Sequence, residues 1–383
     1  MKYLQGKYKL NIVRCITIFA FFAMSFLLFA QLFLPNYSSD WPLHLKFVCD
    51  STESSNYSLF HIILKAVYVT FDSYHVLSIA TAFIGFASNI ISYFLVRSFL
   101  LEKIVEKKYI VEFLSLSMFF ISMIIIPFSQ FKTGYLGVGS PNPWHNPTYF
   151  LSRPFAICSF ILILRVNDLL QNNKKYIKPL ICLSITLFFS VLMKPSFYFV
   201  FLPALFVYYL YFLIKSKFKR IYDCFVLGLS VVPAGLVLII QNIILFGEEN
   251  SINVSLNGKL WTELAPQNSV LLAIILSLAF PIFVTITNFK KLNFEHIIVI
   301  LSTFFGIAEA YFFIENGPRY YHGNFFWGYY FSMFFAHLIS IITFINDKNK
   351  NILNKTIGWT LFSLHLVSGI FYFCKVLLGL SYY

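Results

Sequence analysis

The chain has 383 residues, of which 58% are hydrophobic and only 12% are charged, and its formal net charge is +13. Soluble globular domains carry about 25% charged residues, so this composition excludes a soluble enzyme and indicates a single integral membrane domain over residues 1–383. The positive charge would favour nucleic acid in a soluble protein. In a membrane protein, the positions of the basic residues instead indicate which connections lie on the cytoplasmic side. We therefore expect no nucleic-acid partner.

Apolar runs of about 20 residues, the length that crosses a bilayer, alternate with short polar clusters along the chain. Since lipid satisfies no backbone hydrogen bonds, these runs predict an all-α polytopic transmembrane bundle of about eleven helices. The expected spans are residues 15–34, 74–96, 110–127, 149–166, 179–194, 196–214, 223–246, 268–288, 294–314, 325–345 and 357–380. Lys194-Pro195-Ser196 is either an outer turn between two helices or a kink within one helix.

The connections differ in charge on the two sides of the expected membrane. With the N-terminus in the cytoplasm, the cytoplasmic connections hold most of the basic residues, as the positive-inside rule requires. Most of the acids then fall in the outer segments, residues 35–73, 128–148, 247–267 and 315–324. We therefore expect a multi-pass protein, with the lipid bilayer as its surroundings, in a bacterial inner membrane.

The first outer segment carries the first candidate site. Two short helices, from Trp41 to Cys49 and from Tyr57 to Phe71, are expected to lie along the outer interface. Asp40 and His44 stand four residues apart and would share one helix face. A carboxylate there can act as a base, or hold a divalent cation such as Mg²⁺ or Mn²⁺ against a sugar phosphate. An ordinary N-cap role for Asp40 fits the pattern equally well.

The second candidate is the loop from Gly139 to Thr148, which contains three prolines. Trp144 offers a stacking surface for a sugar ring, and His145 and Asn146 can hydrogen-bond hydroxyls or phosphate oxygens. Five residues after the loop, Arg153 suits a bidentate grip on phosphate, or simply snorkels to the interface.

The third candidate is the polar cluster between Glu309 and Trp327. Glu309 falls within an expected span, where an ionisable residue marks a site or an internal ion pair, with Arg319 or Glu315 as its partner. Lys194, at the outer end of a helix, either neutralises a lipid phosphate or snorkels. The remaining polar members of the cluster are His322 and Asn324.

A first span followed at once by an outer loop with Asp40 and two short interfacial helices resembles the GT-C superfamily of membrane glycosyltransferases. The Tyr57–His61 helix start and Lys194-Pro195-Ser196 also look like features of bacterial members. The resemblance covers about the first half of the chain. The chain departs from the pattern in lacking a C-terminal soluble domain and a clear paired-acid motif after Asp40.

The resemblance implies a GT-C-like fold, a polyprenyl-phosphate sugar donor and an active-site acid, which matches Asp40. By location and chemistry, Arg153, Lys194 and Arg319 would then bind phosphate, while Trp144, His145 and Asn324 would position the sugar or acceptor. The expected product is a cell-surface glycan or glycolipid, such as O-antigen or capsule. Two other functions remain open. One is an O-antigen or capsule polymerase or ligase that uses the outer arginines, and the other is a glycan-lipid transporter or flippase that uses Glu309.

Overall fold

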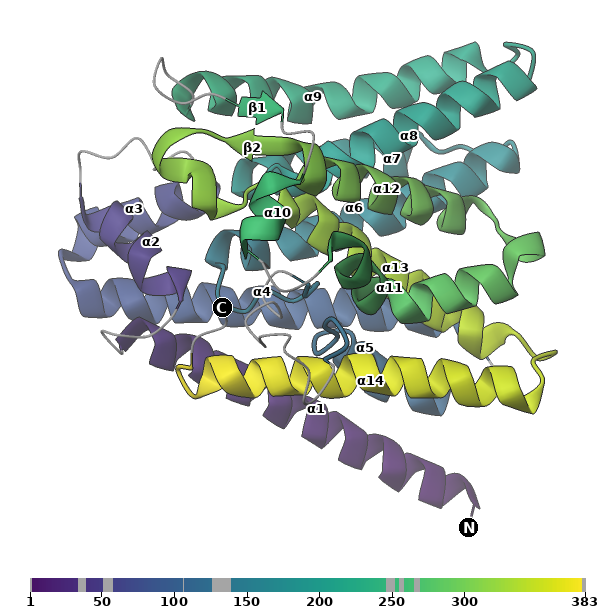
Figure 1. Cartoon of the computed structure of the whole chain (residues 1–383), viewed down its shortest axis with the longest axis horizontal. Helices are drawn as coiled ribbons and strands as arrows, with labels where there is room; N and C mark the ends of the chain where they lie inside the picture. Colours follow the sequence, from purple (N-terminus) through teal and green to yellow (C-terminus); the bar gives the residue numbers. More distant parts are fainter. Residues whose placement is uncertain are drawn as a thin grey trace.

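A computed structural model describes residues 2–33, 39–50, 58–105, 107–125, 139–245, 252–254, 258–264 and 269–380. The described chain is predominantly helical (Figure 1). Its longer helices are α1 (Lys2–Phe33), α4 (Tyr74–Lys103), α6 (Pro147–Gln171), α7 (Ile177–Met193), α8 (Ser196–Lys215), α9 (Ile221–Leu245), α11 (Val270–Thr287), α12 (Phe294–Phe312), α13 (Phe326–Asn346) and α14 (Ile352–Leu377).

Shorter elements connect these helices. They are the α-helices α2 (Asp40–Cys49), α3 (Leu59–Phe71), α5 (Val111–Ser117) and α10 (Lys259–Leu264), and the 3₁₀ helices η1 (Lys108–Ile110), η3 (Phe289–Lys291) and η4 (Gly317–His322). Strands β1 (Ile252–Val254) and β2 (Phe313–Glu315) form one antiparallel pair, in which Ile252 lies opposite Glu315. The two short helices expected in the first outer segment are present as α2 and α3.

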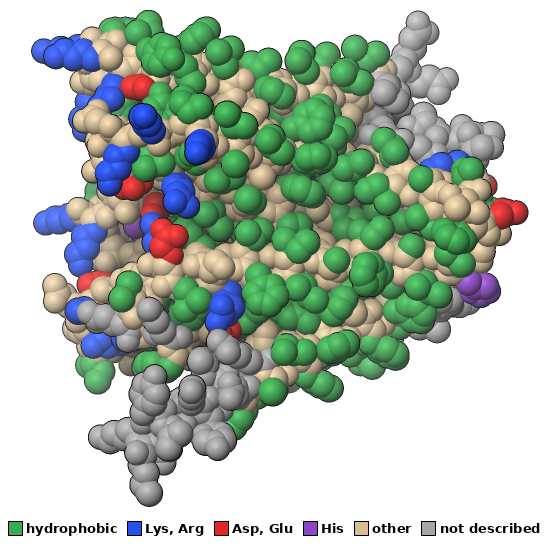
Figure 2. Space-filling view, turned by 180° about the vertical axis from the view of Figure 1, so that it is seen from behind, with side chains coloured by type: hydrophobic (Ala, Val, Ile, Leu, Met, Phe, Trp, Pro, Cys, Tyr) green, Lys and Arg blue, Asp and Glu red, His purple; other side chains and the backbone are tan. Residues whose placement is uncertain are grey.

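The described helices identify a multi-pass integral membrane protein. Eight of them are long and apolar enough to cross a bilayer, namely α4, α6, α8, α9, α11, α12, α13 and α14. Shorter apolar helices lie at Cys15–Gln31, Leu59–Phe71 and Ile177–Met193. Hydrophobic side chains cover the visible face between the two ends of the molecule (Figure 2), as contact with lipid requires. The predicted helical membrane bundle is confirmed, whereas the count of about eleven helices is not.

The two ends of the bundle differ in charge. Lysines and arginines gather along one edge of the molecule (Figure 2), which we call the basic end. There Lys103 pairs with Glu295, and Lys291 pairs with Asp347 at 3.0 Å. Helices α2 and α3 lie at the opposite end (Figure 1), which we call the α2–α3 end.

Helix α13 forms the centre of the bundle. Of its apolar 18-residue stretch, 94% is buried, against 72% for the corresponding stretch of α6 and less for the other spans. Glycine permits this close packing. A Cβ atom at Gly306 of α12 would lie 2.7 Å from the Cα of Tyr329, and one at Gly328 of α13 would lie 2.6 Å from a methyl of Val200. The start of α13 is therefore held tightly between α12 and α8.

The predicted continuous helix over residues 110–127 is wrong. Helix α5 ends at Ser117, and residues 121–125 run through the interior without regular secondary structure. Other elements supply the backbone partners: the amide of Ser122 donates to the His365 carbonyl at 3.2 Å, and that of Ile124 donates to the Leu276 carbonyl at 3.0 Å. Non-helical backbone is tolerated at membrane depth only when protein satisfies it, and hydropathy cannot reveal such partners.

The two interpretations of Lys194-Pro195-Ser196 are now distinguished. Helix α7 ends at Met193 and α8 begins at Ser196, so the segment is a turn between two helices and not a kink. The backbone amide of Lys194 still donates to the Ser190 carbonyl at 2.9 Å, which closes the last turn of α7. The turn lies towards the α2–α3 end, since Lys194 contacts Thr148 at the start of α6.

A substitution at Gly369 of α14 tests the non-helical path of residues 118–125. A Cβ atom there would lie 1.3 Å from the carbonyl oxygen of Phe120, so Gly369→Ala is expected to cost more than about 3 kcal/mol or to prevent accumulation. A Cβ atom at Gly228 of α9 meets nothing within 4 Å, and Gly228→Ala is the control, with an expected gain of up to about 1 kcal/mol. Apparent melting temperature and yield in detergent are the measurements. Equal behaviour of the two variants would contradict the described path of residues 118–125.

Candidate functional site

The start of α2 orients Asp40 towards the loop that precedes α6. Ser39, not Asp40, caps the helix, because its hydroxyl accepts from the Trp41 amide at 3.3 Å. The Asp40 amide donates to the His145 carbonyl at 3.0 Å. The Asp40 carboxylate accepts a hydrogen bond from the Asn146 side chain at 2.9 Å through Oδ2, and its Oδ1 has no partner among the described residues. The capping interpretation of Asp40 is therefore wrong.

Asn146 connects this carboxylate to α6. Its Oδ1 accepts from the Tyr149 amide at 2.9 Å as the N-cap of α6, and also from the Thr148 hydroxyl at 3.0 Å. Because both bonds need an acceptor, they fix which side-chain atom is oxygen and direct Nδ2 towards Asp40. Pro147 at the first helical position suits this start. Local helix capping thus determines where the Asp40 carboxylate is held.

Lys194 brings a cation to the same place. Its Nζ donates to the Thr148 hydroxyl at 3.2 Å and lies 4.6 Å from the centre of the Trp327 ring, a cation–π contact. Thr148 is thereby bonded to both Lys194 and Asn146, and Asn146 is bonded to Asp40. A cation and a carboxylate are joined through two neutral side chains.

A pair of histidines lies between α2 and α3. Nδ1 of His44 and Nε2 of His61 are 2.7 Å apart, and Nδ1 of His61 is 2.8 Å from the Ser58 hydroxyl. One imidazole must donate and the other accept, so the tautomer of His61 decides that of His44. If His61 donates to Ser58, Nε2 of His44, which has no described partner, is a proton acceptor. In the other tautomer it is a donor.

The imidazoles of the site are held in the neutral form. Burial lowers the pKa of His61 to about 4, with repulsion by Lys194 as the second cause. Burial also lowers the pKa of His44 well below its ordinary value, with help from His61, Lys194 and His322. The pKa of His145 is lowered by burial and by Lys194, although Asp40 opposes the shift.

Two expected site residues belong to the interior. Trp144 is fully buried, with its ring centre 5.1 Å from those of Phe150 and Phe373, so it presents no stacking surface to a sugar. Arg153 is fully buried too, and its guanidinium donates to Asn142 at 3.0 Å and to Asn89 at 2.7 Å. It neither grips phosphate nor snorkels. Both expectations fail because the loop folds inward over α6.

The Glu309–Trp327 segment is only partly brought to the site. Glu315 is buried and accepts from the Asn324 side chain, so these two residues hold β2 against the end of η4. Glu309 contacts Gly328 and has no ion-pair partner among the described side chains. Arg319 lies in η4, but its side chain is outside those that the structure describes. The predicted pairing of Glu309 with Glu315 is not observed.

A divalent cation was a candidate cofactor at Asp40. Within the described residues, no group of three or more His, Cys, Asp and Glu side chains is arranged to hold a metal ion. The side chains that hydrogen bonds connect to Asp40 are an amide, a hydroxyl and an ammonium, and the ammonium would repel a metal cation. They do not fit a metal ion held by protein side chains alone, and no chemical step below depends on one.

Sequence reasoning missed several residues around Asp40. His61 bonds to His44 between α2 and α3, although the two residues are 17 positions apart in the sequence. Thr148 and Trp327 were treated only as the ends of motifs, although both contact Lys194. Tyr372, whose hydroxyl lies 3.0 Å from Nδ1 of His145, gave no signal in the sequence. Contacts between distant segments create all of these relations.

An apolar groove opens on the side of the bundle between α11 and α12, with α13 as its floor. Its volume is about 370 Å³. On α12 it extends from His296 to Ile307, which corresponds to about 16 Å along the helix. Ile307 precedes Glu309 by less than one helical turn, and Glu309 contacts Gly328, the residue after Trp327. The groove therefore ends near the α2–α3 end of the molecule.

The lowered pKa of His61 predicts a pH-dependent stability. Between the folded pKa of His61, about 4, and its ordinary value of 6.5, the unfolded chain binds more protons than the folded chain. The stabilisation is therefore complete above about pH 6.5 and is lost progressively as the pH decreases below this value. From pH 7.5 to pH 5, His61 alone should account for about 2 kcal/mol. Melting temperatures of the unaltered chain and of His61→Gln, compared across this range, measure it. An equal pH response of the two proteins would contradict the prediction.

No protein-family model, curated protein or solved structure matches the chain. Hydrogen bonds join Asp40 to Lys194 through Asn146 and Thr148, and His44, four residues after Asp40 on α2, pairs with His61. We call Asp40, His44, His61, Asn146 and Lys194 the Asp40 site.

Proposed function

We propose that the chain is a membrane glycosyltransferase that moves a sugar from a polyprenyl-phosphate donor to a glycan or glycolipid acceptor. One observation carries the proposal. The Asp40 carboxylate and the Lys194 ammonium, from segments more than 150 residues apart, are joined through Asn146 and Thr148 at one end of a membrane bundle. Sugar transfer from a lipid phosphate needs such a pair, a base for the acceptor and a cation for the leaving phosphate.

In the proposed reaction, Asp40 accepts the proton of an acceptor hydroxyl. The acceptor oxygen forms a bond to the anomeric carbon as the bond between that carbon and the lipid phosphate oxygen breaks. The electron pair of the broken bond stays on the phosphate, whose charge Lys194 stabilises. Asn146 holds the carboxylate in position, and its bonds to Thr148 and Tyr149 prevent it from rotating away.

Neutral imidazoles suit this chemistry. His44 and His145 add hydrogen-bonding groups for sugar hydroxyls without adding charge, because burial keeps both unprotonated. The Trp327 ring lies beside Lys194 and holds its ammonium through a cation–π contact. The apolar groove of α11, α12 and α13 supports a donor that carries a long lipid chain.

The proposed orientation follows from the charge of the two ends. By the positive-inside rule we assign the basic end, and with it the N-terminus, to the cytoplasm. The Asp40 site then lies on the non-cytoplasmic side of the membrane. On that side, lipid-linked sugars are used to build surface glycans. A bacterial inner membrane remains our proposal for the location.

One observation favours a second candidate, a glycan-lipid transporter or flippase. The non-helical segment 121–125 crosses the bundle interior beside His365. The rings of His365 and His337 are in edge-to-face contact, with their centres 4.6 Å apart. Interrupted helices near the membrane centre are typical of transporters. Reconstituted vesicles distinguish the two functions, since a transporter moves a labelled lipid-linked sugar without forming a glycosidic bond. A polymerase or ligase is less well supported, because Arg153 is buried.

Asp40→Asn is the central test. Loss of the base should lower transfer from a panel of labelled polyprenyl-phosphate sugars by about 100- to 10,000-fold, with melting temperature nearly unchanged. Asp72→Asn is the matched control, because it makes the same chemical change at the C-cap of α3, and asparagine accepts the left-handed conformation of that residue, φ 43°. Full transfer activity in a normally inserted Asp40→Asn protein would remove the proposed mechanism.

Lys194 is expected to act on the donor phosphate. Lys194→Gln should lower kcat/KM for the donor by about 100-fold, while Lys194→Arg, which keeps the charge, should retain part of the activity. KM for the acceptor should change little in either variant. Steady-state kinetics with each substrate varied in turn measure these effects. Equal losses in both variants would show that the residue serves packing against Trp327 and not charge.

A further inference from the structure

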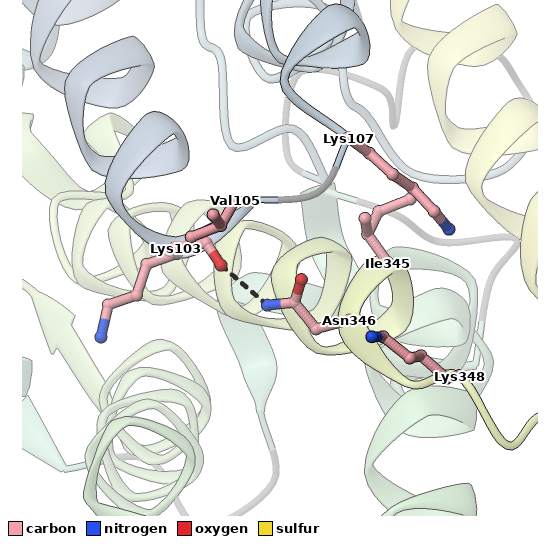
Figure 3. Close-up of a pocket in the computed structure, with 6 residues that line it drawn as sticks. All are labelled: Lys103, Val105, Lys107, Ile345, Asn346 and Lys348. Carbon is pink, nitrogen blue, oxygen red and sulfur yellow. Dashed lines mark hydrogen bonds between the residues drawn. The ribbon is translucent and has the colours of Figure 1, made fainter.

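A polar pocket lies at the basic end, far along α13 from the Asp40 site. It has a volume of about 270 Å³ and forms where the ends of α4 and α13 meet (Figure 3). The Asn346 side chain donates to the Lys103 carbonyl at 2.9 Å and so joins the two helix ends. The residues that line the pocket are Lys103, Val105, Lys107, Ile345, Asn346 and Lys348.

The lysines of the pocket differ in their surroundings. The Lys103 ammonium points away from Asn346 and pairs with Glu295 (Figure 3). Lys107 and Lys348 lie on the other side of Asn346 in the same view, and both are exposed. Lys107 has no ion-pair partner among the described residues. Two ammonium groups from separate connections thus border one cavity.

The local potential is positive. Asp347 is shared by two lysines, Lys291 at 3.0 Å and Lys350 at 3.8 Å. Burial is the main cause that lowers the pKa of Lys350 to about 8, and repulsion by Lys291, Lys107 and Lys355 adds to it, against the attraction of Asp347. An anion that entered the pocket would therefore relieve repulsion among several lysines.

Exposed apolar side chains occur in the pocket lining and at the start of α14. Val105 lines it and is 65% exposed, while Ile352 and Leu353, just after Lys350, are 83% and 63% exposed. Large apolar side chains so exposed beside lysines, at the ends of membrane-spanning helices, indicate contact with lipid. A free inorganic anion would need the lysines but not these exposed apolar side chains.

We propose that this pocket binds the phosphate headgroup of an anionic phospholipid in the leaflet at the basic end, with Lys107 and Lys348 contacting the phosphate oxygens. Ammonium groups bind phosphate as point charges, and anionic leaflets attract lysines next to spanning helices. Asn346 positions the two helix ends that form the pocket. The inference is independent of the proposed transferase reaction, since the pocket and the Asp40 site lie at opposite ends of α13.

Lipid retention tests the proposal. The purified chain in detergent would be incubated with dioleoylphosphatidylglycerol or dioleoylphosphatidylcholine, and bound lipid measured by native mass spectrometry. Lys107→Gln with Lys348→Gln should weaken retention of phosphatidylglycerol by about 10-fold or more and leave phosphatidylcholine unchanged. The control double variant, Lys174→Gln with Lys175→Gln, removes the same charge from two exposed lysines between α6 and α7 and should retain phosphatidylglycerol normally.

Three results would overturn the assignment. Equal losses in the two double variants would show diffuse attraction to the whole basic end. Equal retention of the two lipids by the unaltered chain would show no anion preference. Displacement of phosphatidylglycerol by millimolar inorganic phosphate would identify a site for the free anion and not for a lipid. All the substituted lysines are exposed, so both variants are expected to fold, which their melting temperatures would check.

Discussion

The Asp40 site depends on the hydrogen bonds made by one side chain, that of Asn146. Its oxygen caps α6 and its amide group holds the Asp40 carboxylate, so one residue fixes both a helix start and a charged group from another helix. A carboxylate held in this way loses little rotational freedom when a substrate binds. Lys194 depends on the same cap through Thr148. Losing this cap would separate the acid from the cation.

The surrounding bundle provides the rigidity that the cap requires. Arg153, one and a half turns into α6, donates to Asn142 and Asn89 and stacks on Phe150 at 4.1 Å, which ties the loop before α6 to α4. A buried cation is costly unless hydrogen bonds compensate, and removing its partners would leave that cost uncompensated. We interpret Arg153 as a residue that supports the loop. Its effect on the Asp40 site is indirect, through the position of Asn146.

Residues of the same chemical type have different roles because their depth differs. Arg153 and Lys194 were both expected to bind phosphate, yet Arg153 lies in the interior and Lys194 at a helix end. Trp144 and Trp327 are both buried and differ in their neighbours, since Trp144 packs against Phe150 and Phe373 whereas Trp327 contacts Lys194. Depth depends on how a loop folds back over its helix. The inward path of residues 139–146 is fixed by bonds to distant segments, such as the one from the Trp41 indole to the Trp144 carbonyl at 3.0 Å.

The sequence by itself determined the solvent, the helical class, the short helices α2 and α3 and the separation of basic from acidic connections, because hydrophobicity and charge are local properties of a segment. It also singled out Asp40, His145 and Lys194. Only the tertiary structure decided that Ser39 and not Asp40 caps α2, that His44 bonds to His61, and that residues 118–125 cross the bundle without a helix. These outcomes depend on hydrogen-bond partners far away in the chain, which no local pattern specifies.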